Sequence, residues 1–314
     1  MGVSTSIVVE QIAIMFLVMA VGFVLYRADF IDDRGAAQMS DLVLYVANPV
    51  LIARALMRGF DAALLEGALW VSVVAAVTLV LALVLGRVLY GADAVHERAG
   101  RFAILFSNAG FIGIPLAQAL VGSDGVFYIS VANTVQTSLM WTYGVWLVSG
   151  DRTAMSWRKV LFNPALIAMV IGLACFATSW RPPVVIDSAL DVLGSLNTGL
   201  VMLVLGAYLG QCRVRAVARD GQIYKVCAAR LLVMPALTLA VLAAMNVLVP
   251  TSEAARLTGL LYQAMPVAAV ASLFAHRFGS DSDFATGAVA MSTLCSLATL
   301  PVWIAAYGVL FGAM

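Results

Sequence analysis

Long apolar segments recur along the whole chain, and they constrain its fold more than any other feature. Hydrophobic residues make up 63% of the 314 positions, charged residues make up 11%, and the mean hydropathy is +1.00. A soluble domain is about 45–50% apolar and about 25% charged. Because a bilayer offers no partner for backbone N–H and C=O groups, apolar segments that cross it form helices. The composition therefore predicts an all-α polytopic membrane protein.

The apolar runs divide into ten candidate spans, each close to the length of about 20 residues that a bilayer-crossing helix needs. We expect these spans at 7–26, 37–57, 66–90, 101–120, 126–149, 164–180, 188–210, 226–249, 256–276 and 285–311. The longest loops between them lie near 150–163 and 211–225, so no separate soluble domain is expected.

Basic residues are distributed unevenly between alternate loops. If the N-terminus is outside, the outside loops contain only Arg54, Arg58, Arg181 and Arg256, and nearly all other Lys and Arg residues lie in inside loops. Positive charge accumulates on the cytoplasmic side of membrane proteins. We therefore expect both termini to lie outside.

Two apolar segments, 107–116 and 263–270, are interrupted by proline at matching places in the two halves of the chain. Pro115 and Pro266 lack an N–H group, and each frees the carbonyl four residues earlier, which must then face protein or a water-lined cavity. Paired interruptions of this kind point to the substrate site of a secondary transporter. Two proline kinks that only pack against their neighbours are the alternative interpretation.

The two halves also match elsewhere, since Asn48-Pro49 in the second span has a counterpart in Asn197-Thr198 of the seventh. Five spans followed by five related spans give the second copy the opposite direction, because five is odd. We therefore expect inverted repeats at 1–149 and 164–314, joined by a cytoplasmic linker at 150–163.

The interrupted segments supply most of the candidate substrate-binding residues. Glycines permit close backbone approach, an asparagine amide can both donate and accept, and a helix that begins after an interruption presents N–H groups suited to a carboxylate. We expect the two segments to cross, and Asn48 and Asn197 to line the other wall. The candidate set is Asn108, Gly110, Gly113, Pro115, Asn133, Gln263, Met265, Pro266, Asn48 and Asn197.

Two further spans contain several hydroxyl and amide side chains that we expect to face the protein interior. Lining of the site and interhelical hydrogen bonding are equally good explanations for them. They are Ser130, Asn133, Thr134, Gln136, Thr137 and Ser138 in the fifth span, and Thr286, Ser292, Thr293, Ser296 and Thr299 in the tenth.

Charged side chains are nearly absent from the middle of the spans. Asp41 and Asp191 are interpreted as helix caps, and Arg54 either attracts anions or extends its side chain to the interface. No nucleophile–base pair or phosphate-binding loop is present, so no enzyme, cofactor or metal is expected. Because a sodium site often includes carboxylates, the lack of an acid at the interruptions favours proton coupling or uniport over sodium coupling.

The run from Asn108 to Leu116 resembles the hallmark of the auxin efflux carrier family, which includes bacterial malonate-type transporters. Segments that agree with this resemblance lie along the whole chain, at 163–164, 205–209, 230–235, 265–281 and 292–301. The resemblance implies ten helices in two inverted five-helix repeats, a fold akin to that of the bile-acid:sodium symporters. The linker is short, unlike the long central loop of many plant members, and it suggests a prokaryotic inner-membrane protein.

The resemblance also implies a mechanism. Helices one, two, six and seven would form a scaffold that dimerises, and helices three to five and eight to ten would form a transport domain that slides as an elevator. By position, Asn108 would hold the carboxylate of the substrate. One departure is Asn197-Thr198, where relatives often have proline, and it leaves the scaffold contact open.

The resulting hypothesis is a secondary carrier of a small organic anion. The alternatives are a sodium-coupled, bile-acid-like symporter, a channel, and a non-transporting membrane sensor on the same scaffold.

Overall fold

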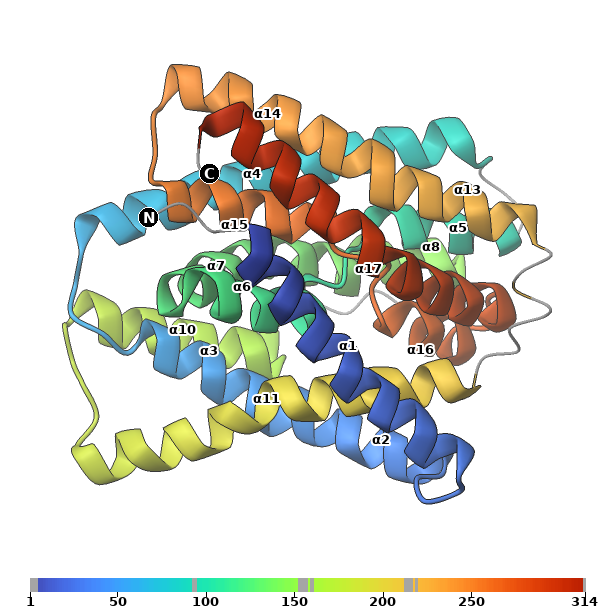
Figure 1. Cartoon of the computed structure of the whole chain (residues 1–314), viewed down its shortest axis with the longest axis horizontal. Coiled ribbons are helices and arrows are strands. Elements are labelled where there is room, and N and C mark those ends of the chain that lie inside the picture. Colours follow the sequence, from blue (N-terminus) through green and yellow to red (C-terminus); the bar gives the residue numbers. More distant parts are fainter. Residues whose placement is uncertain are drawn as a thin grey trace.

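The computed structural model describes residues 5–91, 95–151, 158, 161–211, 217 and 220–312. Within these residues the chain forms helices and an isolated β-bridge, with no strand of any length, which confirms the all-α prediction (Figure 1). Six of the helical segments are long and apolar enough to cross a membrane. The protein is therefore an integral membrane protein. Most of the expected linker at 150–163 lies outside the described residues, as do Arg152, Lys159, Arg213, Arg215 and Arg219, which contributed to the expected orientation.

In its described residues, the first half of the chain runs through eleven helical elements, three of which are short π-helical turns. They are α1 (Thr5–Arg27), α2 (Asp33–Leu42), η1 (Val43–Ala47), α3 (Asn48–Leu56), α4 (Ala62–Leu89), α5 (Val95–Leu105), η2 (Ala109–Gly113), α6 (Ile114–Val121), α7 (Ser123–Leu139), η3 (Met140–Gly144) and α8 (Val145–Ser149). The second half comprises α10 (Pro164–Ala177), α11 (Val184–Gln211), α13 (Gly221–Ala228), η5 (Ala229–Val233), α14 (Met234–Leu248), α15 (Glu253–Ala264), α16 (Val270–Arg277) and α17 (Ser282–Phe311).

Prolines explain the position of three of the described π-helical turns, while η3 has no proline after it. The turns η1, η2 and η5 are each followed within two residues by proline, at Pro49, Pro115 and Pro235. Because proline donates no hydrogen bond and crowds the preceding turn, the wider π turn accommodates it without ending the helix. Pro266 is different, because α15 ends before it and the next helix begins only at Val270.

The helix caps correct part of the sequence interpretation. The side chains of Asp32 and Asp61 accept hydrogen bonds from the first turns of α2 and α4. Asp41 and Asp191 lie inside α2 and α11, so the prediction that they cap helices is wrong. The capping aspartates lie in the short loops before the apolar runs, where hydropathy alone gives no boundary.

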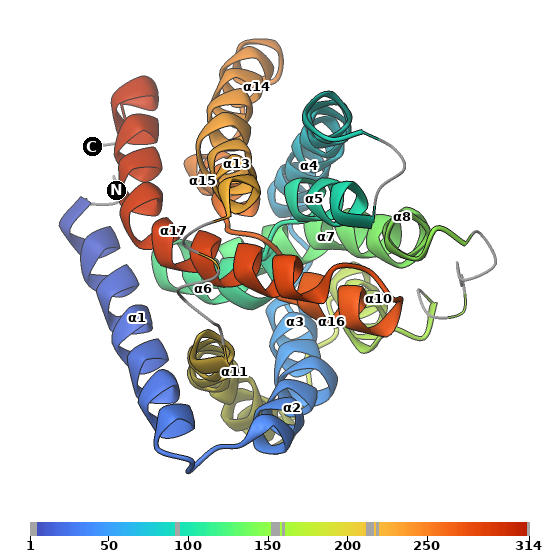
Figure 2. The same cartoon turned by 90° about the vertical axis from the view of Figure 1, so that its right-hand side faces the viewer.

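Helices of the two halves pack in a reciprocal way. Helix α1 of the first half lies along α11 of the second, and α10 of the second half lies along α3 of the first. Helices α3 and α11 also touch each other, and these four helices occupy one side of the molecule. On the other side, α4 packs against α5, α7, α14 and α15 (Figures 1 and 2). The interrupted segments lie among this second group.

Candidate functional site

The two interrupted segments meet in a short antiparallel bridge between Ser107 and Val267. The N–H of Asn108 donates to the carbonyl of Pro266 at 2.8 Å, and the N–H of Ala268 donates to the carbonyl of Phe106 at 3.0 Å. We call residues 106–108 and 265–268 the crossing. The backbone N–H and C=O groups of the two extended segments therefore bond to each other at the place where each segment has left its helix.

Side chains complete the hydrogen bonding on the first segment of the crossing. The hydroxyl of Ser107 donates to the carbonyl of Tyr262 at 2.9 Å, which is the carbonyl that Pro266 deprives of its helical partner. The Oε1 atom of Gln136 accepts from the backbone N–H of Ser107 at 3.2 Å, and it lies 2.9 Å from the Ser107 hydroxyl, whose one proton it shares with the carbonyl of Tyr262. The Nε2 atom of Gln136 donates to the carbonyl of Ser107 at 2.7 Å. Gln136 on α7 thus bonds to both the backbone N–H and the backbone C=O of Ser107.

A fully buried arginine lies where α5 and α15 end. The guanidinium of Arg230, which is 0% exposed, donates to the carbonyls of Ile104, Gln263 and Met265 at 3.0, 2.9 and 3.1 Å. It also donates to Oε1 of Gln263 at 2.6 Å, while Nε2 of Gln263 donates to Thr78 Oγ1 at 2.9 Å. All four acceptors of Arg230 are oxygens of neutral groups.

A cavity of about 220 Å³ opens beside the crossing, between α11, α16 and α17. Ala269, the residue before α16, and Ser272 and Leu273 of the first turn of that helix border it. Thr293 of α17 also lines it, is 1% exposed, and has a hydroxyl without a hydrogen-bond partner. Ser272 and Thr286 share a hydrogen bond of 2.6 Å on the wall. Among the described residues that line the cavity, none is charged.

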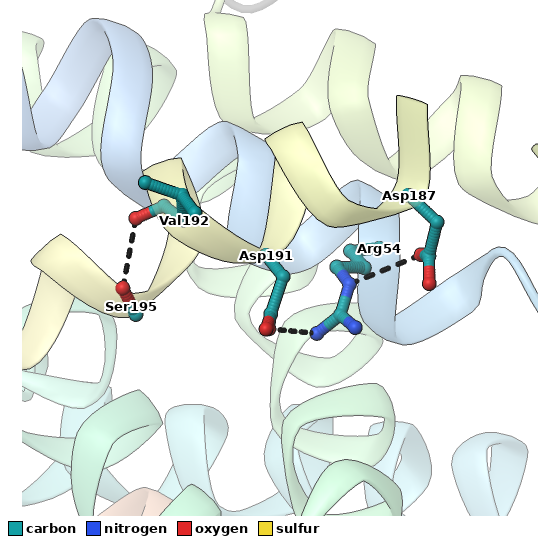
Figure 3. A network of polar contacts seen from close by, with 5 residues as sticks. All are labelled: Arg54, Asp187, Asp191, Val192 and Ser195. Atoms are coloured by element: carbon teal, nitrogen blue, oxygen red, sulfur yellow. Dashed lines mark hydrogen bonds and ion pairs between the residues drawn. The ribbon is translucent and has the colours of Figure 1, made fainter. Parts of the chain in front are cut away.

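Ion pairs join helices α3 and α11. Arg54 of α3 lies between Asp187 and Asp191 of α11, bonded to both at 3.1 and 2.5 Å (Figure 3). Arg54 therefore neither stands free to attract anions nor merely reaches the interface.

Further along the same contact, Gly194 faces the backbone of Leu51, and this register sets Asn48 opposite Asn197. Asn48 is 5% exposed and Asn197 is 0% exposed. Oδ1 of Asn48 and both amide atoms of Asn197 lack a hydrogen-bond partner.

Comparison with known proteins decides the family. The model for the membrane transport protein family matches residues 7–154 and 151–304. The chain belongs to this family. It is 24% identical, over 94% of its length and 96% of the relative's, to an uncharacterized transporter of Methanothermobacter thermautotrophicus. It is also 27% identical over 148 residues to a probable auxin efflux carrier component 1c of Oryza sativa subsp. japonica, covering 46% of this chain and 24% of that protein. The resemblance to the auxin efflux carriers is thus confirmed.

Within this family member, the crossing brings together most of the predicted site residues. A Cβ atom on Gly113 would lie 2.9 Å from Ile129 Cδ1 and 3.3 Å from Met265 Cγ, so glycine permits the close approach of the two segments. A Cβ atom on Gly110 would lie 3.5 Å from the amide nitrogen of Asn133. Asn108 is 2% exposed, and its amide nitrogen has no partner.

Three predicted residues do not present a free side chain at the crossing. Asn48 and Asn197 belong to the contact between α3 and α11, and the amide of Gln263 is engaged on both sides by Arg230 and Thr78. Gln136 was expected to face the interior, and it makes interhelical hydrogen bonds to Ser107, whereas the sequence gave no role to Arg230 or Ser107. A signal for Arg230 was available, because an arginine inside an apolar span must find oxygen partners in the interior. Its partners are backbone carbonyls, which sequence alone does not point to.

Proposed function

We propose that the protein is a secondary carrier of a small organic anion with one negative charge, a monocarboxylate with an apolar body. The observation that carries the proposal is the cavity beside the crossing, with the N-terminus of α16 and the unpartnered hydroxyl of Thr293 at its edge. Membership of a membrane transport protein family supports it.

The chemistry of the cavity favours this substrate class. The N-terminus of a helix carries about half a positive elementary charge and presents N–H groups to an anion. The hydroxyl of Thr293 adds a hydrogen-bond donor, and apolar residues such as Leu205, Leu209 and Leu273 surround the remaining space. Because no basic side chain lines the cavity within the described residues, a second carboxylate would have no partner. Asn108 does not line this cavity, but its amide nitrogen is unpartnered in the crossing beside it, and we assign it as a second ligand that the moving domain would bring to the substrate.

The packing of the helices supports an elevator with inverted repeats. The reciprocal contacts of α1 with α11 and of α10 with α3 are those that two exchanged copies of one five-helix unit would make. In our proposal α1, α2–α3, α10 and α11 form the scaffold, and the remaining helices form the moving domain that contains the crossing. The cavity lies between α11 of the first group and α16 and α17 of the second, which is where a sliding domain would carry its substrate.

From the distribution of basic residues we propose that both termini lie outside and that the cavity, at the last turns of α11, opens on the cytoplasmic side. We propose a multi-pass protein of a prokaryotic inner membrane that forms a homodimer through the scaffold. Proton coupling or uniport fits the crossing better than sodium coupling, because no carboxylate lies among the described groups that bond to it.

The test is uptake of labelled monocarboxylates and dicarboxylates by liposomes that contain the purified protein. We expect saturable uptake of a monocarboxylate, with counterflow when the vesicles are preloaded with unlabelled substrate. Asn108→Ala is expected to lower uptake while inserting normally, since the backbone bonds of Asn108 in the crossing remain. Flux without saturation or counterflow would indicate a channel. Failure to move any carboxylate, by a folded protein, would contradict the proposal and favour a sensor.

A further inference from the structure

We infer that Arg230 is a resident cation of the crossing: its guanidinium occupies the place in which a cation-coupled carrier of this architecture would bind its metal ion. In transporters with interrupted helices, unwound carbonyls and the C-terminal ends of half-helices coordinate the coupling cation. Those groups are the partners of Arg230 here, namely the carbonyls of Ile104, Gln263 and Met265.

The interrupted helices leave these carbonyls without their usual donors. The N–H of Asn108, four residues after Ile104, is used by Pro266 of the opposite segment. The N–H of Val267, four residues after Gln263, donates instead to the hydroxyl of Ser292 at 3.1 Å. Buried carbonyls that have lost such partners need another donor. Arg230 supplies donors to both segments at once.

The charges also balance. The C-terminus of each helix carries about half a negative elementary charge, so the ends of α5 and α15 together present about one negative charge. The guanidinium carries one positive charge and remains protonated in proteins. A buried cation is costly unless it is compensated in this way. None of the three ion pairs between the described residues involves Arg230, and its fourth bond goes to the neutral amide oxygen of Gln263.

A cation that is part of the chain removes the need for a coupling ion at the crossing. Because Arg230 on η5 cannot leave, the crossing needs no ion from solution to satisfy its carbonyls, and no sodium ion travels with the substrate. This inference bears on the coupling of the proposed transport, but its main readout is stability, which requires no substrate. It can therefore fail while the proposed substrate class stands, and the reverse also holds.

The experiment compares the apparent Tm of the purified protein in sodium chloride and in choline chloride at equal ionic strength. For the unaltered protein we expect equal Tm values, and equal initial rates of uptake once a substrate is known. A sodium-specific rise in Tm, or uptake that requires sodium, would overturn the inference without any variant being made.

Arg230→Gln removes the positive charge and leaves the carbonyls of Ile104, Gln263 and Met265 without their guanidinium donor. We expect a Tm in choline chloride that is lower by about 5–10 °C, of which sodium or lithium restores about 2–4 °C by binding the vacated oxygens. The matched control is Arg256→Gln, at the other end of α15, where Arg256 bonds to Asn246 and to the carbonyl of Thr251. This control should show no difference between the salts.

The response to sodium separates a resident cation from a merely structural side chain. If Arg230→Gln folds and its Tm is lower by the same amount in both salts, the inference is wrong. If that variant cannot be isolated, Arg230→Lys, which keeps the charge with fewer donors, decides together with the unaltered protein. The lysine variant should be less stable yet still indifferent to sodium, and a sodium response in it would contradict a resident cation.

Discussion

The two sides of the crossing differ in how completely their polar groups are satisfied. On the side where α5 and α15 end, every backbone carbonyl described above has a donor, from Arg230, Ser107, Gln136 or a backbone N–H, although the buried hydroxyl of Tyr262 has no partner. On the side where α16 begins there is a cavity, and the buried hydroxyl of Thr293 has no partner. An unsatisfied buried polar group costs stability, so its retention beside a cavity is best explained by a ligand that completes it. One side of the crossing holds the structure together, and the other is available for binding.

The largest effect on stability is expected from Arg230→Met, on the satisfied side. The substitution keeps much of the side-chain volume but leaves four buried oxygens without their donor. Removing one partner of a buried charged arrangement costs about 3–5 kcal/mol. Denaturant unfolding in detergent should show this loss. A loss below about 1 kcal/mol would mean that water or another side chain can replace the guanidinium, and the two sides would not differ as described.

Gln136→Leu should have the next largest effect, because it removes all three bonds to Ser107 and leaves a buried N–H and C=O. Each unsatisfied group costs about 1–3 kcal/mol, so we expect a loss of about 2–4 kcal/mol in the same unfolding assay. The control on the same helix is Thr134→Val, since the hydroxyl of Thr134 bonds to the carbonyl of Ser130 in its own turn and to the sulfur of Met169. Equal losses for the two variants would argue against a special role for Gln136.

Thr293→Val tests the side of the crossing where α16 begins and the cavity lies. Valine has the same shape and removes an oxygen without a partner, so the free energy of unfolding should change by less than about 0.5 kcal/mol. If Thr293 binds the substrate, the affinity measured by uptake should fall by about tenfold, equivalent to about 1.4 kcal/mol. Thr299→Val is the control, because its hydroxyl is also buried and unpartnered on α17 but does not line the cavity. Similar uptake by both variants would remove Thr293 from the site.

Arg54→Gln should have the smallest effect, although Arg54 has two acidic partners and Arg230 has none. The side chains of Arg54, Asp187 and Asp191 are 35%, 46% and 60% exposed, so water screens their attraction (Figure 3). Exposed ion pairs contribute about 0–1 kcal/mol. Unfolding measurements should therefore rank Arg54→Gln well below Arg230→Met. The opposite ranking would show that the contact between α3 and α11 depends on this network.

The sequence predicted much of this arrangement because membrane helices leave strong signals. Long apolar runs located the six long helices, and the interruptions at Pro115 and Pro266 pointed to the segments that form the crossing. The resemblance in 108–116 identified the family, which the family comparison confirmed. These features depend on local composition and spacing, which a single sequence displays.

What the sequence did not reveal depends on contacts between distant residues. Gln263 looked like a substrate ligand, yet its amide is used by Arg230 and Thr78, which are far from it in the chain. Asp191 looked like a helix cap, yet it faces Arg54 across two helices. Thr293 was one of several hydroxyls on its span, and only packing distinguishes it from Ser296, which bonds within its own helix. Residue type fixes the donors and acceptors, but the fold decides which of them remain unpartnered.

The most direct test of the contrast between the two sides is the thermal stability of the unaltered protein with a panel of monocarboxylates and dicarboxylates in sodium-free buffer, repeated with sodium. A ligand that binds only the folded state raises the apparent Tm by mass action. We predict that a monocarboxylate raises Tm more than the matching dicarboxylate, and that sodium changes neither shift. A shift that requires sodium, or that favours the dicarboxylate, would contradict the account.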